Sequence, residues 1–258
     1  MLIATFNVNS IRSRLPIVLK WLKIHKPDIL CLQETKVQDS EFPVEPITQA
    51  GYDVIFKGEK SYNGVAILSK VKILQHSFGF DDETMSKDET RLIYARFKDF
   101  HLFNTYVPQG RDIEDQMYQY KLQWFERLLN MFKKKFNPSD KIIWLGDLNI
   151  APTDLDVHNP KQHLNHVCFH KDAKNAFGKV VSWGFVDLFR KHHPNVRQYT
   201  FFDYRVRNAV ENNIGWRVDH ILATEPIAKI CKNCQIDIAP RKEVKASDHT
   251  ILFAEFDL

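Results

Sequence analysis

The stretch Ile29-Leu30-Cys31-Leu32-Gln33-Glu34-Thr35-Lys36 decides the fold class, because its apolar run ends in a single carboxylate. Such a run is typical of a buried strand that delivers one charge to the edge of a sheet. A buried carboxylate is costly unless a cation or hydrogen-bond donors meet it. We therefore expect Glu34 to have such a partner where the strand ends.

Polar residues flank four further strand-like segments in the same way. They are Leu2 to Phe6 before Asn7-Val8-Asn9, Ile142 to Leu145 before Gly146-Asp147-Leu148-Asn149, Val218 before Asp219-His220, and Ile251-Leu252-Phe253 after Ser247-Asp248-His249. Carboxylate and amide oxygens are the ligands that hard cations such as Mg²⁺ prefer. The pattern predicts one oxygen-rich site assembled from distant parts of the chain.

Composition sets limits on the class of protein. The chain has 258 residues and a net charge of +4, which permits a polyanionic partner without demanding one. No apolar run approaches the roughly 20 residues of a membrane span, and no secretory signal is recognisable, so we expect a cytoplasmic protein with no membrane partner. The four cysteines are too few for a disulfide framework, and the lone Cys231-Lys232-Asn233-Cys234 pattern is more simply a pair of structural thiols.

Strand and helix patterns alternate along the whole chain, which predicts one α/β domain over residues 1–258. Helices are expected at Ile11–Lys26 and Gln116–Phe136, the second with Met117, Tyr120, Trp124, Leu128 and Met131 on one face and Lys133-Lys134-Lys135 at its solvated end. Further strands are expected at Tyr52–Phe56, Gly64–Leu68, Leu92–Phe97, His101–Val107, Val218–Ala223 and Thr250–Phe256. Several strands follow one another without a helix, which favours mixed sheets packed face to face over a purely parallel sheet.

Seven motifs occur in order from Leu2 to Phe256 and closely resemble those of the exonuclease III family. They are Phe6-Asn7-Val8-Asn9-Ser10-Ile11-Arg12, Leu32-Gln33-Glu34-Thr35-Lys36, Asn63-Gly64-Val65-Ala66-Ile67-Leu68-Ser69, Tyr106-Val107-Pro108-Gln109-Gly110, Gly146-Asp147-Leu148-Asn149-Ile150-Ala151-Pro152, Trp183-Gly184-Phe185-Val186-Asp187 and Ser247-Asp248-His249. This is the apurinic/apyrimidinic (AP) endonuclease branch of the deoxyribonuclease I-like fold. The resemblance implies a four-layer αββα sandwich of two mixed β-sheets flanked by helices, and cleavage of DNA phosphodiesters with Mg²⁺, for which Mn²⁺ substitutes.

The resemblance also implies roles for individual residues. Glu34 is the principal metal ligand, and Asn7, Asn9, Asp147, Asn149 and Asp248 lie around the cation. The catalytic set is Tyr106, Asp147, Asn149, Asp219 and His249. Asp147 activates or orients water, Asn149 positions the water or a phosphate oxygen, Asp219 keeps His249 cationic near the phosphate, and Tyr106 donates a hydrogen bond. Whether one or two metal ions act stays open.

The segments Tyr199–Arg205 and Gly215–Asp219 resemble those with which this branch inserts an aromatic wedge and lines a pocket for a base-free sugar. We place Phe201 and Trp216 against DNA and Phe202 in the core, on the view that the two phenylalanines alternate on a strand. Gln109, Arg91 and Cys168 complete the expected DNA contacts, and the cations Arg12, Lys36, Arg91, Arg111, Arg205 and Lys245 are candidates for the phosphate backbone. The expected partner is double-stranded DNA with damaged or recessed 3′ ends or abasic sites, bound by a monomer.

The loop after the Asp147 motif departs from the family pattern. AP endonucleases of this family often carry Gly-Phe-Thr-Pro there, and here Cys168-Phe169-His170-Lys171 takes its place. A side chain instead of glycine is expected to obstruct a flipped abasic nucleotide and to leave a frayed 3′ end accessible. The same loop holds His158, His163, His166 and His170, whose spacing matches no compact zinc site and favours a solvated loop.

Two other functions remain open from the sequence alone. A phosphoesterase of the same fold could act on a small molecule or a lipid headgroup, although no apolar membrane-facing stretch supports it. A catalytically idle DNA-binding relative is the other alternative, and the complete residue set from Asn7 to His249 argues against it.

Overall fold

Two mixed six-stranded sheets form the centre of the computed structural model, which describes residues 1–82, 84 and 88–258. The first sheet has the order β11 (Cys231–Asp237), β12 (Ile251–Phe256), β1 (Leu2–Asn7), β2 (Ile29–Gln33), β4 (Val65–Ser69) and β3 (Asp53–Lys57). The second has the order β5 (Gln75–Phe78), β6 (Leu92–Arg96), β7 (His101–Tyr106), β8 (Ile142–Asp147), β10 (Asp219–Thr224) and β9 (Phe185–Asp187).

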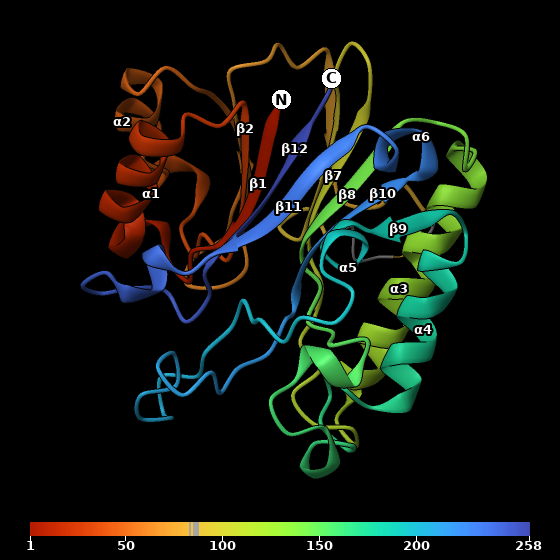
Figure 1. Cartoon of the computed structure of the whole chain (residues 1–258). Helices are drawn as coiled ribbons and strands as arrows, with labels where there is room; N and C mark the ends of the chain where they lie inside the picture. Colours follow the sequence, from red (N-terminus) through yellow and green to blue (C-terminus); the bar gives the residue numbers. More distant parts are fainter. Residues whose placement is uncertain (83, 85–87) are drawn as a thin grey trace.

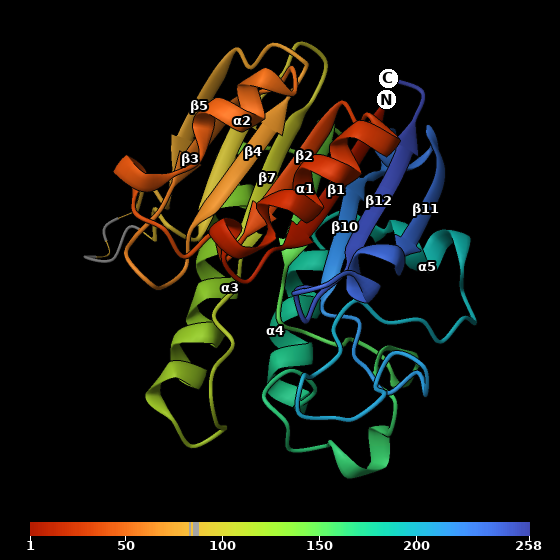
Figure 2. The same cartoon turned by 90° about the vertical axis from the view of Figure 1, so that its left-hand side faces the viewer.

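Helices cover the outer face of each sheet (Figure 1). Helices α1 (Ile11–His25) and α2 (Val44–Gln49) pack on the first sheet, and α3 (Gln116–Lys135) and α4 (Lys171–Val181) pack on the second. Short helices α5 (Leu188–His192) and α6 (Glu225–Ala228) and the 3₁₀ turns Asp39–Glu41, Asp154–Asp156, Pro160–Gln162 and Ala239–Lys242 complete the described elements. Figure 2 shows the termini side by side on adjacent strands. The predicted αββα sandwich is confirmed.

Three apolar cores hold the four layers together. The central core lies between the sheets and takes Ile3 and Cys31 from one sheet and Leu145 and Ile221 from the other. The outer cores join each sheet to its helices, with Trp21 of α1 on one side. Both faces of the central strands β1, β2 and β8 are therefore buried, which explains why these strands read as continuous apolar runs.

Strand direction brings the polar strand ends to one edge of the sandwich. β1 and β2 are parallel, with Asn7 opposite Gln33, and β7 and β8 are parallel, with Tyr106 opposite Asp147. β10 runs antiparallel to β8 and pairs Asp219 with Asp147. β12 is likewise antiparallel to β1, so that its first residues reach the same edge. The predicted convergence of the strand ends on one rim is confirmed.

A buried polar chain crosses the interface between the two sheets. The Gln33 amide donates hydrogen bonds to Thr5 (2.9 Å) and to Asn104 (2.7 Å), a β7 residue of the opposite sheet. Asn104 in turn donates to the backbone oxygens of Leu32 and Ala66. Because these groups satisfy one another, the sheets are fixed in one relative position, and Tyr106 at the end of β7 is fixed relative to Glu34.

Several predictions of local structure were wrong in detail. The buried face of α3 carries Tyr118, Lys121, Trp124, Phe125, Leu128, Leu129 and Phe132, while Met117, Tyr120 and Met131 are only partly buried. The predicted face was therefore rotated by about one residue. Phe201 lies on no regular strand but makes single bridges to Trp216 and His249. Phe202 is buried as predicted, in a small apolar cluster with Tyr199 and Ala209 that is separate from the three main cores.

A buried ion network braces the segments that lead into the site. Arg217 is fully buried and donates to Asp156 (2.6 Å), Asp187 (2.8 Å) and Nδ1 of His220 (3.0 Å). Nε2 of His220 lies 2.8 Å from the backbone oxygen of Ile150, which only accepts, so the ring proton is on Nε2. The network joins the loop after β8 to the start of β10, on which Asp219 lies.

Replacing Arg217→Met should destabilise the protein by about 3–5 kcal/mol, because it leaves buried carboxylates without their cation. Burial opposes ionisation of Asp156 and Asp187, but the Arg217 charge outweighs it and holds both pKa values below the usual range. This stabilisation is present above the unfolded pKa of about 3.9 and is lost as the pH falls further. Urea unfolding should therefore show a larger difference from wild type at pH 7 than at pH 3.

The matched control for this variant is Arg12→Met, which removes an exposed ion pair to Glu41. We expect it to cost less than about 1 kcal/mol. If Arg217→Met and Arg12→Met lowered the free energy of unfolding equally, the buried network would contribute no more to stability than an exposed ion pair.

Candidate active site

Glu34 lies directly after β2 in the left-handed conformation, with a φ of 50°. Such strain in a residue other than glycine or asparagine is typical of functional positions. The Asn7 amide donates to Oε1 of Glu34 (2.8 Å), and the Lys36 ammonium lies 2.7 Å from Oε2. Burial alone would raise the pKa of Glu34, but the Lys36 charge and the Asn7 hydrogen bond bring it below its usual value. Glu34 is therefore ionised and already faces a cation.

Asp147 ends β8 and is buried. Its backbone approaches β7 closely, since a Cβ on the preceding Gly146 would lie 1.9 Å from the Thr105 oxygen. The Asn7 amide donates to Oδ2 of Asp147 (2.8 Å) as well as to Glu34, and so bridges the two carboxylates. Burial raises the pKa of Asp147 to about 7, in spite of the positive charge of His249 nearby. Without a bound cation, the surroundings of Asp147 therefore compensate its negative charge only in part, and its carboxylate is unusually basic.

His249 faces Asp147 and is oriented from behind by Asp219. Its Nδ1 donates to Oδ2 of Asp219 (2.8 Å), and its Nε2 lies 3.8 Å from Oδ2 of Asp147. Burial opposes the charge on His249, yet the charge of Asp219 dominates and raises the pKa to about 10. The Thr200 hydroxyl accepts hydrogen bonds from the backbone N–H groups of Val218 and Asp219 and so fixes the start of β10. His249 is a cation at neutral pH.

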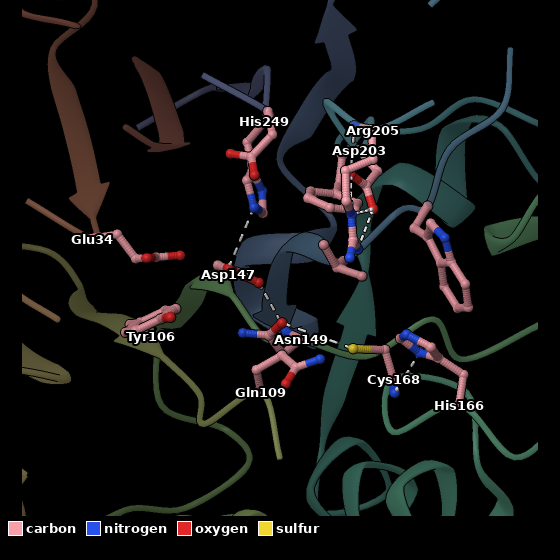
Figure 3. A pocket seen from close by; sticks show the side chains of 14 residues that line it. Glu34, Tyr106, Gln109, Asp147, Asn149, His166, Cys168, Asp203, Arg205 and His249 are labelled. Carbon is pink, nitrogen blue, oxygen red and sulfur yellow. Dashed lines mark hydrogen bonds and ion pairs between the residues drawn. The ribbon is translucent and has the colours of Figure 1, made fainter. Parts of the chain in front are cut away.

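Glu34, Asp147 and His249 converge on one point, where a ligand atom from each lies within 4.8 Å of the others. Figure 3 shows the three side chains directed toward the same space. Among the residues that the structure describes, no other three acidic, histidine or cysteine side chains lie close enough together to hold a metal ion. The donor set fits a hard divalent ion held by the two carboxylates, because a protonated His249 has no lone pair to give on Nε2.

The other predicted metal ligands lie close by but are engaged with one another. The Asn7 side chain presents its nitrogen to the carboxylates, while its oxygen accepts the backbone N–H of Asn9. The Asn9 amide donates to Asp248 (3.0 Å) and accepts from Lys36. Direct ligation by Asn7, Asn9, Asn149 or Asp248 stays a prediction.

Tyr106 lies beside Glu34 at the end of β7 (Figure 3). Burial, together with the charges of Glu34 and Asp147, raises the pKa of its hydroxyl well above the usual value. The hydroxyl therefore keeps its proton and is available as a donor. Arg91 packs over the Tyr106 ring, with its guanidinium carbon 4.8 Å from the centroid, and donates to the Tyr106 backbone oxygen.

Asn149 lies in the loop after β8 and faces Asp147. Its backbone has the left-handed conformation, with a φ of 49°. Its N–H donates to Oδ1 of Asp147 (3.0 Å), and its side-chain amide donates to the Val107 oxygen (2.9 Å). The Cys168 thiol lies 3.8 Å from the Asn149 side-chain oxygen. Cys168 lines the pocket with its thiol buried and directed toward Asn149 (Figure 3), and its contact with DNA stays a prediction.

A pocket of about 220 Å³ opens beside this centre. Its lining includes the predicted contact residues Gln109, Cys168, Phe201 and Trp216. The histidines of this loop are exposed or partly exposed, as expected, but two of their rings also pack against Trp216, with ring centroids of His166 and His163 at 4.4 and 4.8 Å. Phe201 packs on His249, with centroids 5.0 Å apart. One wall of the pocket is therefore aromatic, and the opposite wall is charged.

The cations expected along the phosphate backbone differ in exposure. Arg12, Arg111, Arg205 and Lys245 are exposed, and Arg205 is paired with Asp203 at the pocket. Lys36 and Arg91 are partly buried against Glu34 and Tyr106. Their contacts with DNA stay predictions.

Two buried basic residues of this region were missed by the sequence reasoning. Lys121 bonds to backbone oxygens of the loops around the site, and Arg217 forms the network described above. A signal for Lys121 was present, because it lies three residues before Trp124 on the apolar face of α3. Arg217, placed between the apolar Trp216 and Val218, gave no comparable signal.

Comparisons with known proteins agree with this geometry. A model of the Endonuclease/Exonuclease/phosphatase family matches residues 4–249. The chain is 32% identical to exodeoxyribonuclease III of Haemophilus influenzae over 98% of both chains. Its structure is similar to that of an AP endonuclease from Archaeoglobus fulgidus, at a TM-score of 0.97 and 53% identity over 100% of both chains. It is also similar to a Neisseria 3′ phosphatase bound to a product DNA hairpin, at a TM-score of 0.92 and 32% identity over 100% of both chains. Within the described residues, no helix is both long and apolar enough to cross a bilayer.

Proposed function

The chain belongs to the endonuclease/exonuclease/phosphatase family as an exodeoxyribonuclease III-type hydrolase, and we propose that it is a Mg²⁺-dependent DNA-repair nuclease. Its proposed reactions are 3′–5′ exonuclease and 3′-phosphatase or phosphodiesterase cleavage at 3′ ends, together with weaker incision 5′ to abasic sites. The observation that carries this proposal is the convergence of Glu34, Asp147 and His249 beside a pocket with an aromatic wall.

Each residue of the centre has a role that follows from its environment. Asp147, basic and buried, accepts a proton from the attacking water or orients it, with Asn149 beside it to hold water or a phosphate oxygen. His249 remains cationic through Asp219 and stabilises negative charge on the phosphate. Tyr106 keeps its proton and donates to the phosphate or the departing oxygen.

Glu34 and Asp147 are the residues that would hold the divalent cation, with Mn²⁺ as the expected substitute for Mg²⁺. When bound, the ion supplies Lewis-acid stabilisation of the charge that develops on the phosphate. Lys36, which now pairs with the outer oxygen of Glu34, balances part of the same negative charge.

The pocket favours DNA over a small-molecule phosphate as substrate. Its volume of about 220 Å³ lies below the roughly 300 Å³ at which pockets for drug-sized ligands begin, and suits a base-free sugar. Phe201 and Trp216 offer apolar surface to the sugar, and extrusion of a nucleotide is least costly where no base is stacked. We further propose that the protein acts as a monomer in the cytoplasm, in keeping with its four free cysteines.

The test is hydrolysis of a set of oligonucleotides that carry a recessed 3′ end, a blunt end, a 3′ phosphate or one abasic analogue, each with Mg²⁺ and with EDTA. Mg²⁺-dependent release of 3′ nucleotides or phosphate is the expected result. Turnover of inositol phosphates or lipid headgroups without turnover of DNA would overturn the proposal in favour of a small-molecule phosphoesterase.

Replacing Cys168→Gly should raise abasic-site incision at least about tenfold, equivalent to about 1.4 kcal/mol in the barrier. The reason is that the thiol occupies space next to Asn149 that a flipped abasic nucleotide would need. Exonuclease activity on a recessed 3′ end should change little, so the ratio of the two rates is the measurement.

Cys168→Ser is the matched control, because it keeps the volume of the side chain, and Cys168→Ala should fall between serine and glycine. Wild-type incision as fast as that of Cys168→Gly would remove the obstruction argument.

A further inference from the structure

Lys121 is a buried cation whose three donors all reach backbone oxygens. Its side chain leaves α3 inward and is fully buried. Nζ lies 3.2 Å from the oxygen of Gln109, 2.7 Å from that of Asn149 and 2.8 Å from that of Val167. An ammonium has three donors and no acceptor, so each of its hydrogens meets one carbonyl.

The three carbonyls belong to three loop segments around the site, two of which lie in the long connection from β8 to α4. Gln109 follows β7, Asn149 follows β8, and Val167 precedes Cys168 in the histidine-containing loop. Gln109 and Cys168 line the pocket, and Asn149 contacts Asp147. One ammonium thus lies behind three loops that each present a residue to the substrate.

The loops also contact one another directly, since Val107, Ile150 and Val167 belong to one apolar core, and Lys121 adds hydrogen bonds to all three. The N–H of Ala151 donates to the Cys168 oxygen (2.7 Å), and the Asn149 side chain donates to the Val107 oxygen. The first loop also packs on the lysine stem, since a Cβ on Gly110 would lie 3.4 Å from Cδ of Lys121.

The energetics argue against a merely space-filling role. Trp124 and Leu128 follow on the same buried face of α3, where an apolar side chain would pack without the cost of desolvating an ammonium. That cost is offset only because loop carbonyls, which lack partners in a helix or sheet, receive strong charge-assisted hydrogen bonds.

We propose that Lys121 is a positioning residue that locks the 107–111, 148–151 and 163–170 loops in the arrangement needed for catalysis. It acts through Asn149, Gln109 and Cys168 and touches no reacting atom. The consequence for turnover rests on the nuclease activity proposed above, whereas the consequence for loop order does not.

The test compares Lys121→Met with Leu128→Ala. Leu128 lies two turns further along α3, fully buried in the apolar core, so its truncation destabilises the protein without removing a hydrogen bond to the loop carbonyls. Both variants are assayed for unfolding free energy, for hydrogen exchange of peptides spanning the three loops, and for kcat and KM on a recessed 3′ end.

In Lys121→Met we expect faster exchange in all three loops and a kcat lower by about 10- to 100-fold, the scale for a misplacement of about 1 Å. In Leu128→Ala, loop exchange and kcat should stay near wild type whatever the loss of stability. Unchanged loop exchange in Lys121→Met, or the same changes in Leu128→Ala, would overturn the inference. An inactive wild-type enzyme would instead refute the proposed function, and loop exchange would still decide the role of Lys121.

Discussion

Asp147→Asn should lower kcat by about 10³- to 10⁴-fold, the upper part of the range for loss of a general base. The substitution keeps the size of the side chain and the acceptor for the Asn149 N–H, but it removes the negative charge. Asparagine cannot accept a proton from water, and the His249 cation 3.8 Å away loses a partner. Single-turnover rates on a recessed 3′ end, measured at saturating Mg²⁺, separate the chemical step from product release.

Binding of DNA should survive this change. Removing a buried carboxylate from beside the phosphate lessens repulsion, so the Kd for the same DNA in EDTA should be unchanged or lower. Asp53→Asn, at the exposed start of β3, is the matched control and should change neither kcat nor the Kd for DNA. Retention of more than a tenth of wild-type kcat by Asp147→Asn would exclude the base role.

The convergence of these residues could be predicted from sequence because it depends on strand direction and little else. Glu34, Asp147 and the Asp219–His249 pair all adjoin apolar runs, and parallel or suitably antiparallel strands bring such ends to one rim. Boundaries were accurate to one or two residues where the run was long and buried, as in β1 and β2. The short edge strands β5 and β9 were not predicted, because few apolar residues mark them.

What the sequence did not reveal was the set of contacts that depend on long-range packing. The place of Lys121 on the apolar face of α3 could signal its burial, but the three loop carbonyls that receive its hydrogen bonds could not be predicted from the sequence. The Asn7 amide bridges Glu34 and Asp147 through its nitrogen while its oxygen accepts from Asn9, and this bridge was not evident in the sequence. The histidine loop is solvated as predicted, but nothing in its own residues shows that two of its rings pack on Trp216.

Glu34→Gln should lower activity by about 10³-fold at a Mg²⁺ concentration that saturates the wild type, because it removes one of two charged ligands. The loss should arise mainly from weaker metal binding. The glutamine side chain introduced by this substitution would still accept from the Asn7 amide, so the fold of the site is retained. Its amide nitrogen, however, would face the Lys36 ammonium that now lies 2.7 Å from Oε2.

Measuring metal affinity in the DNA-free protein distinguishes weaker metal binding from a structural change as the cause of the lost activity. Mn²⁺ titration followed by electron paramagnetic resonance should show at least about tenfold weaker binding in Glu34→Gln, and raising Mg²⁺ should recover part of the activity. Glu255→Gln, an exposed position on β12, is the matched control and should bind Mn²⁺ as the wild type does. Equal Mn²⁺ affinity in Glu34→Gln and wild type would mean that the ion is held elsewhere, and the assignment of Glu34 as principal ligand would have to be abandoned.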